Sequence, residues 1–147
     1  MKKKLLSIAL SSLVVVSLFI GCSNKKNNEN TTVPTNMVSV EHAMGTTEIP
    51  TNPQKVVILT SEGTEALLAL GVKPVGAVTG VTGDWYDHTK DELEGVKQVG
   101  MEREPNIEAI AALKPDLIIG NKMRHEKIYS QLSAIAPTVY SDTIRGA

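Results

Sequence analysis

The chain has 147 residues, of which 41% are hydrophobic and only 3% aromatic, and its formal net charge at pH 7 is −1. Removing residues 1–21 takes away three lysines and no acid, so the charge of the remainder falls to −4. A mildly acidic chain without a basic stripe interleaved with aromatics is a poor nucleic-acid binder. The remaining length is enough for one small domain.

The first 21 residues are predicted to be a lipoprotein signal peptide. Met1–Lys4 is basic, and the 16 residues of Leu5–Ile20 are apolar apart from serines, which is short for a membrane span. The only cysteine, Cys22, follows Gly21 in a stretch that resembles a bacterial lipobox. This resemblance implies cleavage after Gly21 and lipidation of Cys22. Without another cysteine the domain has no disulfide framework.

Residues 22–36 are predicted to form a flexible tether. The stretch "SNKKNNENTTVPT" is polar and of low complexity, so it cannot bury enough apolar surface to fold. The globular part is therefore expected to span residues 37–147.

The first elements after the tether are a hairpin and a strand–helix–strand unit. Alternation in Val38–His42, followed by Gly45 and Thr46–Ile49, predicts a β-hairpin. Val56–Leu59 reads as a buried strand, and Ser61 is predicted to cap a helix. That helix ends at Gly71, and the next strand is Val75–Val78.

A pattern of helix, proline and apolar strand occurs three times, in "LLALGVKPVGAV", "IAALKPDLIIG" and "LSAIAPTVYS". In the second copy Asn106 is predicted to cap a helix whose apolar residues recur at Ile107, Ile110, Ala111 and Leu113, with the first three on its buried face. Leu117–Ile119 follows as a buried strand. Alternating helices and buried strands indicate an α/β fold with a parallel twisted sheet flanked by helices, preceded by the hairpin. Ligands bind such sheets in the loops at the carboxyl ends of the strands, here residues 60–64, 79–89, 120–127 and 141 onward.

The arginines are the first candidate ligand-binding residues. Only Arg103, Arg124 and Arg145 follow the signal segment, and each falls near a strand-to-helix or strand-end loop. Guanidinium groups recognise multi-oxygen anions through bidentate geometry that lysine lacks. Converging on one rim, the three would suit an anionic ligand, whereas each one singly is commonly a surface ion pair.

The loop "GDWYDH" allows further readings. Trp85 and Tyr86 either wall a pocket or pack in the core, and we treat these interpretations as equal. Asp84, Asp87 and His88 have the chemistry of a metal site. The favoured alternative is a solvated loop in which Thr89 and Glu92 form a capping box for a short helix.

The region from Glu41 to Ala147 resembles the N-terminal lobe of siderophore-binding lipoproteins of iron ABC importers from Gram-positive bacteria. The resemblance rests on "HAMGTTEIPTNPQKVVIL", "EALLALGVKPVGAV", "REPNIEAIAALKPDLIIG" and "RHEKIYSQLSAIAPTV". It implies two α/β lobes joined by a long helix, with the ligand between them. The linking helix and second lobe are absent from this chain, so we expect a fragment or a truncated product.

The resemblance also implies a function and residue roles. The expected protein is no enzyme and needs no cofactor or metal ligand of its own. It captures a ferric siderophore, is anchored to the extracellular face of the cell membrane through Cys22, and delivers its ligand to an ABC permease. Arg103 is implied to face the ligand, and Glu108 to dock on the permease.

Two alternatives stay open. One is a haem or cobalamin binding protein of the same superfamily, in which His88 or Tyr86 approaches the metal. The other is a lipid-anchored, metal-dependent enzyme that uses Asp84, Asp87 and His88.

Overall fold

The computed structural model of the protein describes residues 36–142. The predicted signal peptide, the lipidation site at Cys22, all of the tether before residue 36, and Arg145 lie outside the described residues.

The predicted N-terminal hairpin is confirmed. Strands β1 (Met37–His42) and β2 (Gly45–Pro50) pair antiparallel as a two-stranded sheet of their own. The hairpin is held to the last strand, because the Ala43 amide donates to the Tyr140 carbonyl at 3.0 Å. In return, the Tyr140 amide donates to Nδ1 of His42 at 3.2 Å.

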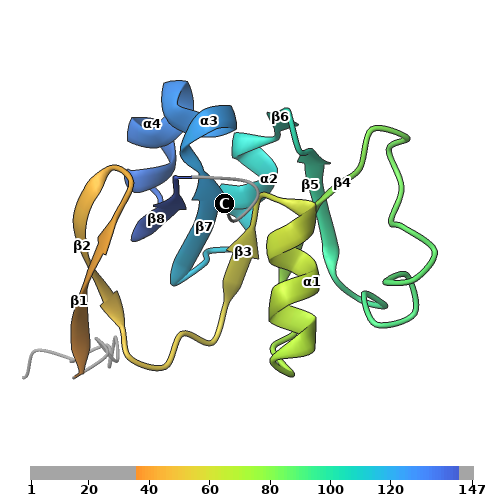
Figure 1. Ribbon diagram of the computed structural model, residues 1–147, viewed down its shortest axis with the longest axis horizontal. Helices are drawn as coiled ribbons and strands as arrows, with labels where there is room; N and C mark the ends of the chain where they lie inside the picture. The colour runs from red at the N-terminus through yellow and green to blue at the C-terminus, as the bar shows by residue number, and fades with distance from the viewer. Residues whose placement is uncertain (1–35, 143–147) are drawn as a thin grey trace, which may run out of the picture. The chain divides into compact units, whose positions relative to one another are not determined.

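The main sheet has six strands in the order β6-β5-β4-β3-β7-β8 (Figure 1). Five of them run parallel, as predicted, and β6 pairs antiparallel with β5. Sequence reasoning missed β5 and β6, since β5 has a single fully buried apolar side chain, Val99, and no apolar run around it. The strands are β3 (Val56–Ile58), β4 (Gly76–Thr79), β5 (Lys97–Met101), β6 (Glu104–Pro105), β7 (Leu117–Asn121) and β8 (Thr138–Ser141).

The helices begin close to where the sequence places them. Thr60, one residue before the predicted Ser61, caps α1, because its Oγ1 accepts from the Gly63 amide at 3.0 Å. Asn106 caps α2 as predicted and accepts from the Ala109 amide at 2.8 Å. The helical elements are α1 (Ser61–Ala69), α2 (Ile107–Ala112), α3 (Lys122–His125), the 3-10 helix η1 (Glu126–Ile128) and α4 (Tyr129–Ser133).

Two local predictions are wrong. Residues 120–127, expected as a loop, are instead the end of β7, the short helix α3 and the start of η1. The capping box of Thr89 and Glu92 does not form, because residues 87–95 make turns instead of a helix. The Thr89 hydroxyl instead donates to the Tyr86 carbonyl at 3.1 Å.

Alternate residues of β3 face opposite sides of the sheet. Val57 and Leu59 belong to the main core, with Ile110 of α2 and Leu132 of α4. Ile58 points to the other side, where α1 packs so closely that a Cβ on Gly63 would lie 2.5 Å from the Ile58 side chain. Helix α1 accordingly crosses the front of the sheet in Figure 1.

The buried face of α2 differs from the predicted one. Ala111 is exposed, whereas Ala109 packs against the core beside Ile107, Ile110 and the predicted apolar residue Leu113. Ile110 and Leu113 lie one turn apart on the same side of the helix, and Ala111 lies off that stripe. Glu108 is exposed, as expected.

The strand order creates a reversal point at β3. The chain leaves β3 toward β4 and β5, and then crosses back to β7 on the other side of β3. In open α/β sheets the crevice at the carboxyl ends beside such a reversal is the usual ligand site.

Candidate ligand-binding cleft

A cleft of about 740 Å³ opens at this carboxyl-end edge of the sheet. It is formed by the start of α1, the loop after β4, the turn between β5 and β6, and helix α3. Its lining residues are Ser61, Glu62, Glu65, Gly80, Val81, Tyr86, His88, Met101, Glu102, Arg103, Glu104 and Arg124.

Two of the three predicted arginines meet in this cleft, Arg103 from the β5–β6 turn and Arg124 from α3. Nη1 of Arg124 lies 2.8 Å from Oε1 of Glu102 and 3.8 Å from Oε1 of Glu62. The contact with Glu102 is close enough for an ion pair but is not aligned as a hydrogen bond. Because Nη1 itself is buried, a ligand would have to pair with the other N–H groups of the guanidinium.

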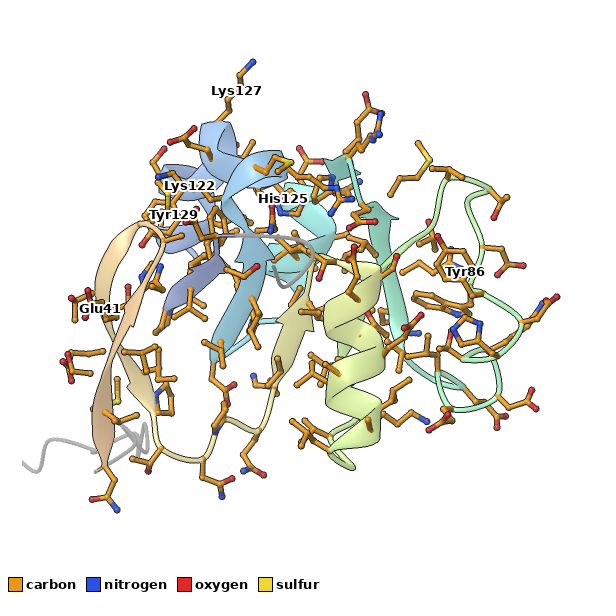
Figure 2. All side chains as sticks on the ribbon, in the orientation of Figure 1. Glu41, Tyr86, Lys122, His125, Lys127 and Tyr129 are labelled. Carbon is orange, nitrogen blue, oxygen red and sulfur yellow. The ribbon has the colours of Figure 1, made fainter. Side chains whose placement is uncertain are left out.

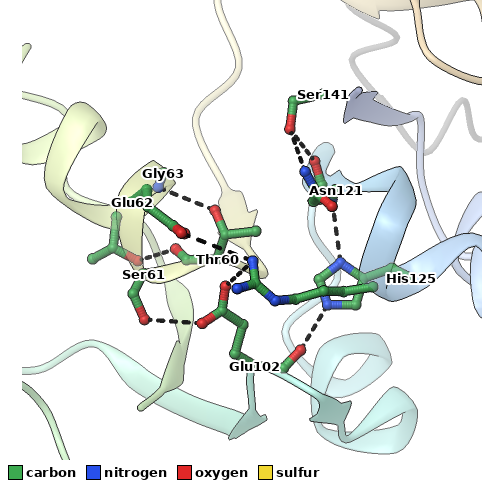
Figure 3. A network of polar contacts seen from close by, with 11 residues as sticks. Thr60, Ser61, Glu62, Gly63, Glu102, Asn121, His125 and Ser141 are labelled. Atoms are coloured by element: carbon green, nitrogen blue, oxygen red, sulfur yellow. Dashed lines mark hydrogen bonds and ion pairs between the residues drawn. The ribbon is translucent and has the colours of Figure 1, made fainter. Parts of the chain in front are cut away.

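Glu102 is the residue that sequence reasoning missed at the centre of the cleft (Figure 3). Its Oε2 accepts from the Ser61 hydroxyl at 3.4 Å. Burial raises the pKa of its carboxyl, Arg124 opposes this shift, and the Glu62 carboxylate reinforces it. The sequence gives little signal for Glu102, because the strand that carries it was not predicted.

A buried histidine supports the floor of the cleft. His125 lies between α3 and the sheet, whereas Lys127 extends outward (Figure 2). Nδ1 of His125 accepts from the Asn121 amide at 3.2 Å, so Nε2 carries the proton and donates to the Glu102 carbonyl at 2.7 Å. Burial lowers the pKa of His125, which favours this neutral form. The histidine thus ties α3 to the turn that carries Arg103.

An aromatic wall stands on the side of the β4–β5 loop. The rings of Tyr86 and His88 are stacked, with centroids 5.8 Å apart and planes inclined by 16°. Nε2 of His88 lies 2.9 Å from Oε1 of Glu65. Gly80 lies under Tyr86, where a Cβ would come within 3.0 Å of the ring. Small size at position 80 therefore lets the ring pack against the backbone.

Trp85 does not line the main cleft. It is half-buried and borders a smaller cavity with Val78 and Leu93. The packing interpretation therefore fits Trp85, and the pocket-wall interpretation fits Tyr86. The smaller cavity shares Ser61, Glu65, Gly80 and Tyr86 with the main cleft, so Trp85 lies in the layer behind its wall.

Two of the three residues of the alternative metal site are engaged with other partners. Oδ1 of Asp84 accepts from the Trp85 amide at 2.8 Å, and His88 pairs with Glu65. Within residues 36–142, no group of three or more His, Cys, Asp or Glu side chains is arranged to hold a metal ion.

Glu108 lies outside the cleft lining, on exposed α2 surface. The same described region contains no helix with the length and apolarity needed to cross a membrane.

Comparison with known proteins adds a family match and close relatives. The family model for periplasmic binding proteins matches residues 56–144. The probable siderophore-binding lipoprotein YfiY of Bacillus subtilis is 55% identical over 98% of this chain and 45% of its own length. The Fe(3+)-citrate-binding protein YfmC of the same organism is 34% identical over 92% of this chain and 42% of its own length.

Solved structures with the same fold include siderophore complexes. Staphylococcus aureus SirA complexed with staphyloferrin B superposes with a TM-score of 0.70 at 50% identity, covering 73% of this chain and 37% of SirA. The siderophore-binding protein BauB, bound to ferric iron and two acinetobactin molecules, gives a TM-score of 0.64 at 34% identity, covering 73% of this chain and 37% of BauB. The chain thus spans less than half the length of these relatives.

Proposed function

The chain belongs to the periplasmic binding protein family, and from that premise we propose that it is part of a solute-binding lipoprotein that captures a ferric siderophore for an ABC importer. The observation that carries this proposal is the convergence of Arg103, Arg124 and Tyr86 on one cleft at the strand ends. Relatives named for siderophore and ferric citrate binding support it.

The chemistry of the cleft suits a preformed iron chelate. A siderophore surrounds its iron with oxygen-rich groups, so the protein has to recognise an anionic surface and not the bare metal. The two guanidinium groups supply charge-assisted hydrogen bonds, and the stacked rings of Tyr86 and His88 supply a flat aromatic wall. The proposed site thus needs no side chain to ligate iron.

The described cleft forms one side of the proposed site. A second α/β lobe, joined through a long helix, is proposed to close over the ligand. Lipidation of Cys22 is proposed to hold the protein on the extracellular face of the membrane, and the tether then lets the lobes reach the permease. Glu108 is the proposed docking residue for that permease.

The test is a binding panel on the full-length protein, followed through quenching of tryptophan fluorescence. Trp85 lies behind the cleft wall, so a bound ferric chelate will quench it. The panel contains ferric staphyloferrin B, ferric citrate, a ferric catecholate, a ferric hydroxamate, haemin and cobalamin, with the iron-free siderophores as controls. Saturable quenching by a ferric siderophore is the expected result.

Other outcomes contradict the proposal in distinct ways. Saturable binding of haemin or cobalamin alone assigns the protein to another ligand class of the superfamily. A rise in melting temperature with a bare divalent metal, and none with any ferric siderophore, favours the metal-dependent enzyme.

A further inference from the structure

The charge balance of the cleft is not that of a simple anion site. Two arginines share its lining with four glutamates, Glu62, Glu65, Glu102 and Glu104. Glu102 differs from the others in burial: its side chain is 15% exposed, whereas those of Glu62 and Glu65 are each 48% exposed. An anionic ligand that pairs with Arg124 therefore lies close to the partly buried Glu102 carboxylate, which already contacts this arginine.

The backbone of Glu102 is fixed from two sides. Its amide donates to the Thr79 carbonyl at 3.1 Å, and its carbonyl accepts from Nε2 of His125 at 2.7 Å. Both Thr79 and His125 are buried. The Glu102 side chain thus starts from a fixed point and reaches Arg124, which is itself 22% exposed. Figure 3 shows this junction of the α1 start, the β5–β6 turn and α3.

We propose that Glu102 is a positioning residue for Arg124, which holds the guanidinium in the empty cleft and takes up a proton when an anionic ligand pairs with Arg124. The inference rests on the proposed function, because it concerns the same site. The single charge of Arg124 cannot compensate the ligand anion and the Glu102 carboxylate together as fully as it compensates Glu102 alone. The displaced Glu102 carboxylate stays in a partly buried position, where the protonated form is the less costly one.

The surroundings of Glu102 act on its pKa in both directions. Burial and the Glu62 carboxylate favour the protonated carboxyl, whereas Arg124 and, to a smaller extent, the hydrogen bonds from Ser61 favour the carboxylate. His125 contributes no charge in its neutral form, and Arg103 and Glu104 are exposed to solvent, which screens them. The charged and titratable groups that face Glu102 are Glu62 from α1, Arg124 and His125 from α3, and Arg103 and Glu104 from its own turn.

The sign of the pH dependence follows from linkage. Ligand binding raises the pKa of Glu102 further. At a pH between the pKa of Glu102 in the empty cleft and its pKa in the occupied cleft, the complex therefore binds up to one proton more than the free protein. Affinity then increases as pH falls through this window, by up to about tenfold per pH unit.

The experiment measures proton uptake on binding by the full-length protein. Ferric staphyloferrin B and ferric citrate are titrated calorimetrically between about pH 5 and pH 7, in pairs of buffers that differ in ionisation enthalpy. The variants are Glu102→Gln, Glu102→Asp and Glu126→Gln. Glu126 is the control, because it is an exposed glutamate at the start of η1, two residues from Arg124, and does not line the cleft.

We expect the wild-type protein and Glu126→Gln to take up the same fraction of a proton, and Glu102→Gln to lose that uptake and its pH slope. Glu102→Asp keeps a titratable group with shorter reach, so it should retain proton uptake with weaker affinity. Equal uptake by wild type and Glu102→Gln, or an equal loss in Glu126→Gln, overturns the inference. If neither chelate binds the wild-type protein, the proposed function fails for these ligands, and this inference fails with it.

Discussion

At the residue scale, Arg103 and Arg124 line the same cleft but differ in burial and in the residues they face. Arg103 is exposed in the tight turn between β5 and β6. Arg124 is mostly buried and faces two glutamates. The two arginines should therefore respond differently to truncation, although each is proposed to pair with the same ligand.

Replacing either arginine with alanine should weaken ferric-siderophore binding by about 2 kcal/mol, because a bound anion loses a charge-assisted partner. Only Arg124→Ala should also lower the free energy of unfolding, by about 1 kcal/mol, because it leaves the partly buried Glu102 carboxylate without its cation. Lysine should restore part of the binding at each position, since it keeps charge but not bidentate geometry. Fluorescence titration and denaturant unfolding measure the two quantities.

Lys127→Ala serves as the control, since Lys127 is exposed and absent from the cleft lining. It should leave both quantities unchanged. Wild-type affinity in both arginine-to-alanine variants would return Arg103 and Arg124 to the role of surface ion pairs.

At the scale of elements, the β5–β6 turn depends on Gly100. Its φ is +95°, and an added Cβ would lie 2.6 Å from the Glu104 carbonyl oxygen and 2.8 Å from the Asn106 amide. Both are backbone atoms that cannot move aside without shifting the turn. The glycine therefore lets the chain fold back tightly enough to bring Arg103 and Asn106 to their positions.

Gly100→Ala should lower the free energy of unfolding by about 3 kcal/mol, through left-handed strain and the backbone clash together. Gly83→Ala is the matched control, because Gly83 has φ +79° but open space around it. Strain alone should cost about 1 kcal/mol there. Chemical denaturation compares the two, and equal losses would show that the clash at Gly100 is relieved by adjustment of the turn.

Helix α2 presents Glu108 to solvent while it buries Ile107 and Ile110. If Glu108 docks on the permease, Glu108→Ala should preserve siderophore affinity and lower iron uptake by cells. Glu108→Lys should lower uptake further, because it places like charges across the docking surface. Glu48→Ala, an exposed acid on the hairpin, is the control for uptake. Normal uptake in both Glu108 variants would contradict the docking role. Glu108 would then act only through the helix dipole, which contributes about 0.3–1 kcal/mol to the stability of the fold.

The elements that could be predicted are those whose signal is local. The hairpin, the strand at β3, the Asn106 cap and the strand at β7 each follow from alternation, apolar runs or capping chemistry, and the structure has them. Strand β5 could not be predicted, because its pairing with β4 compensates for a polar sequence. Glu102 was missed for the same reason, since its position in the cleft comes from a long-range pairing. Arg124 could be proposed from its residue type and its place after the strand at β7, whereas Arg103 was proposed from its residue type, its place ahead of the helix and the family resemblance.

At the scale of the whole molecule, the described part supplies one wall of the proposed binding site. All cleft residues lie between Ser61 and Arg124 and come from four strand-end segments of one sheet. The proposed lipidation site, Cys22, lies outside this stretch, so the proposed ligand recognition and the proposed membrane attachment belong to different parts of the sequence. This separation sets the design of the anchoring experiment.

Cys22→Ala should abolish palmitate labelling of the protein and release the unprocessed or unanchored form from the membrane fraction. The physical reason is that several acyl chains hold a protein stably in a bilayer, whereas a single chain gives only marginal, reversible binding. Ser23→Ala, next to the lipidation site, should keep wild-type labelling. Because the cleft lies on a separate part of the chain, Cys22→Ala should bind ferric siderophore with wild-type affinity and still fail to support uptake by cells. Unchanged labelling in Cys22→Ala would rule out the lipobox interpretation, whereas lost labelling with normal uptake would show that transport does not require the anchor.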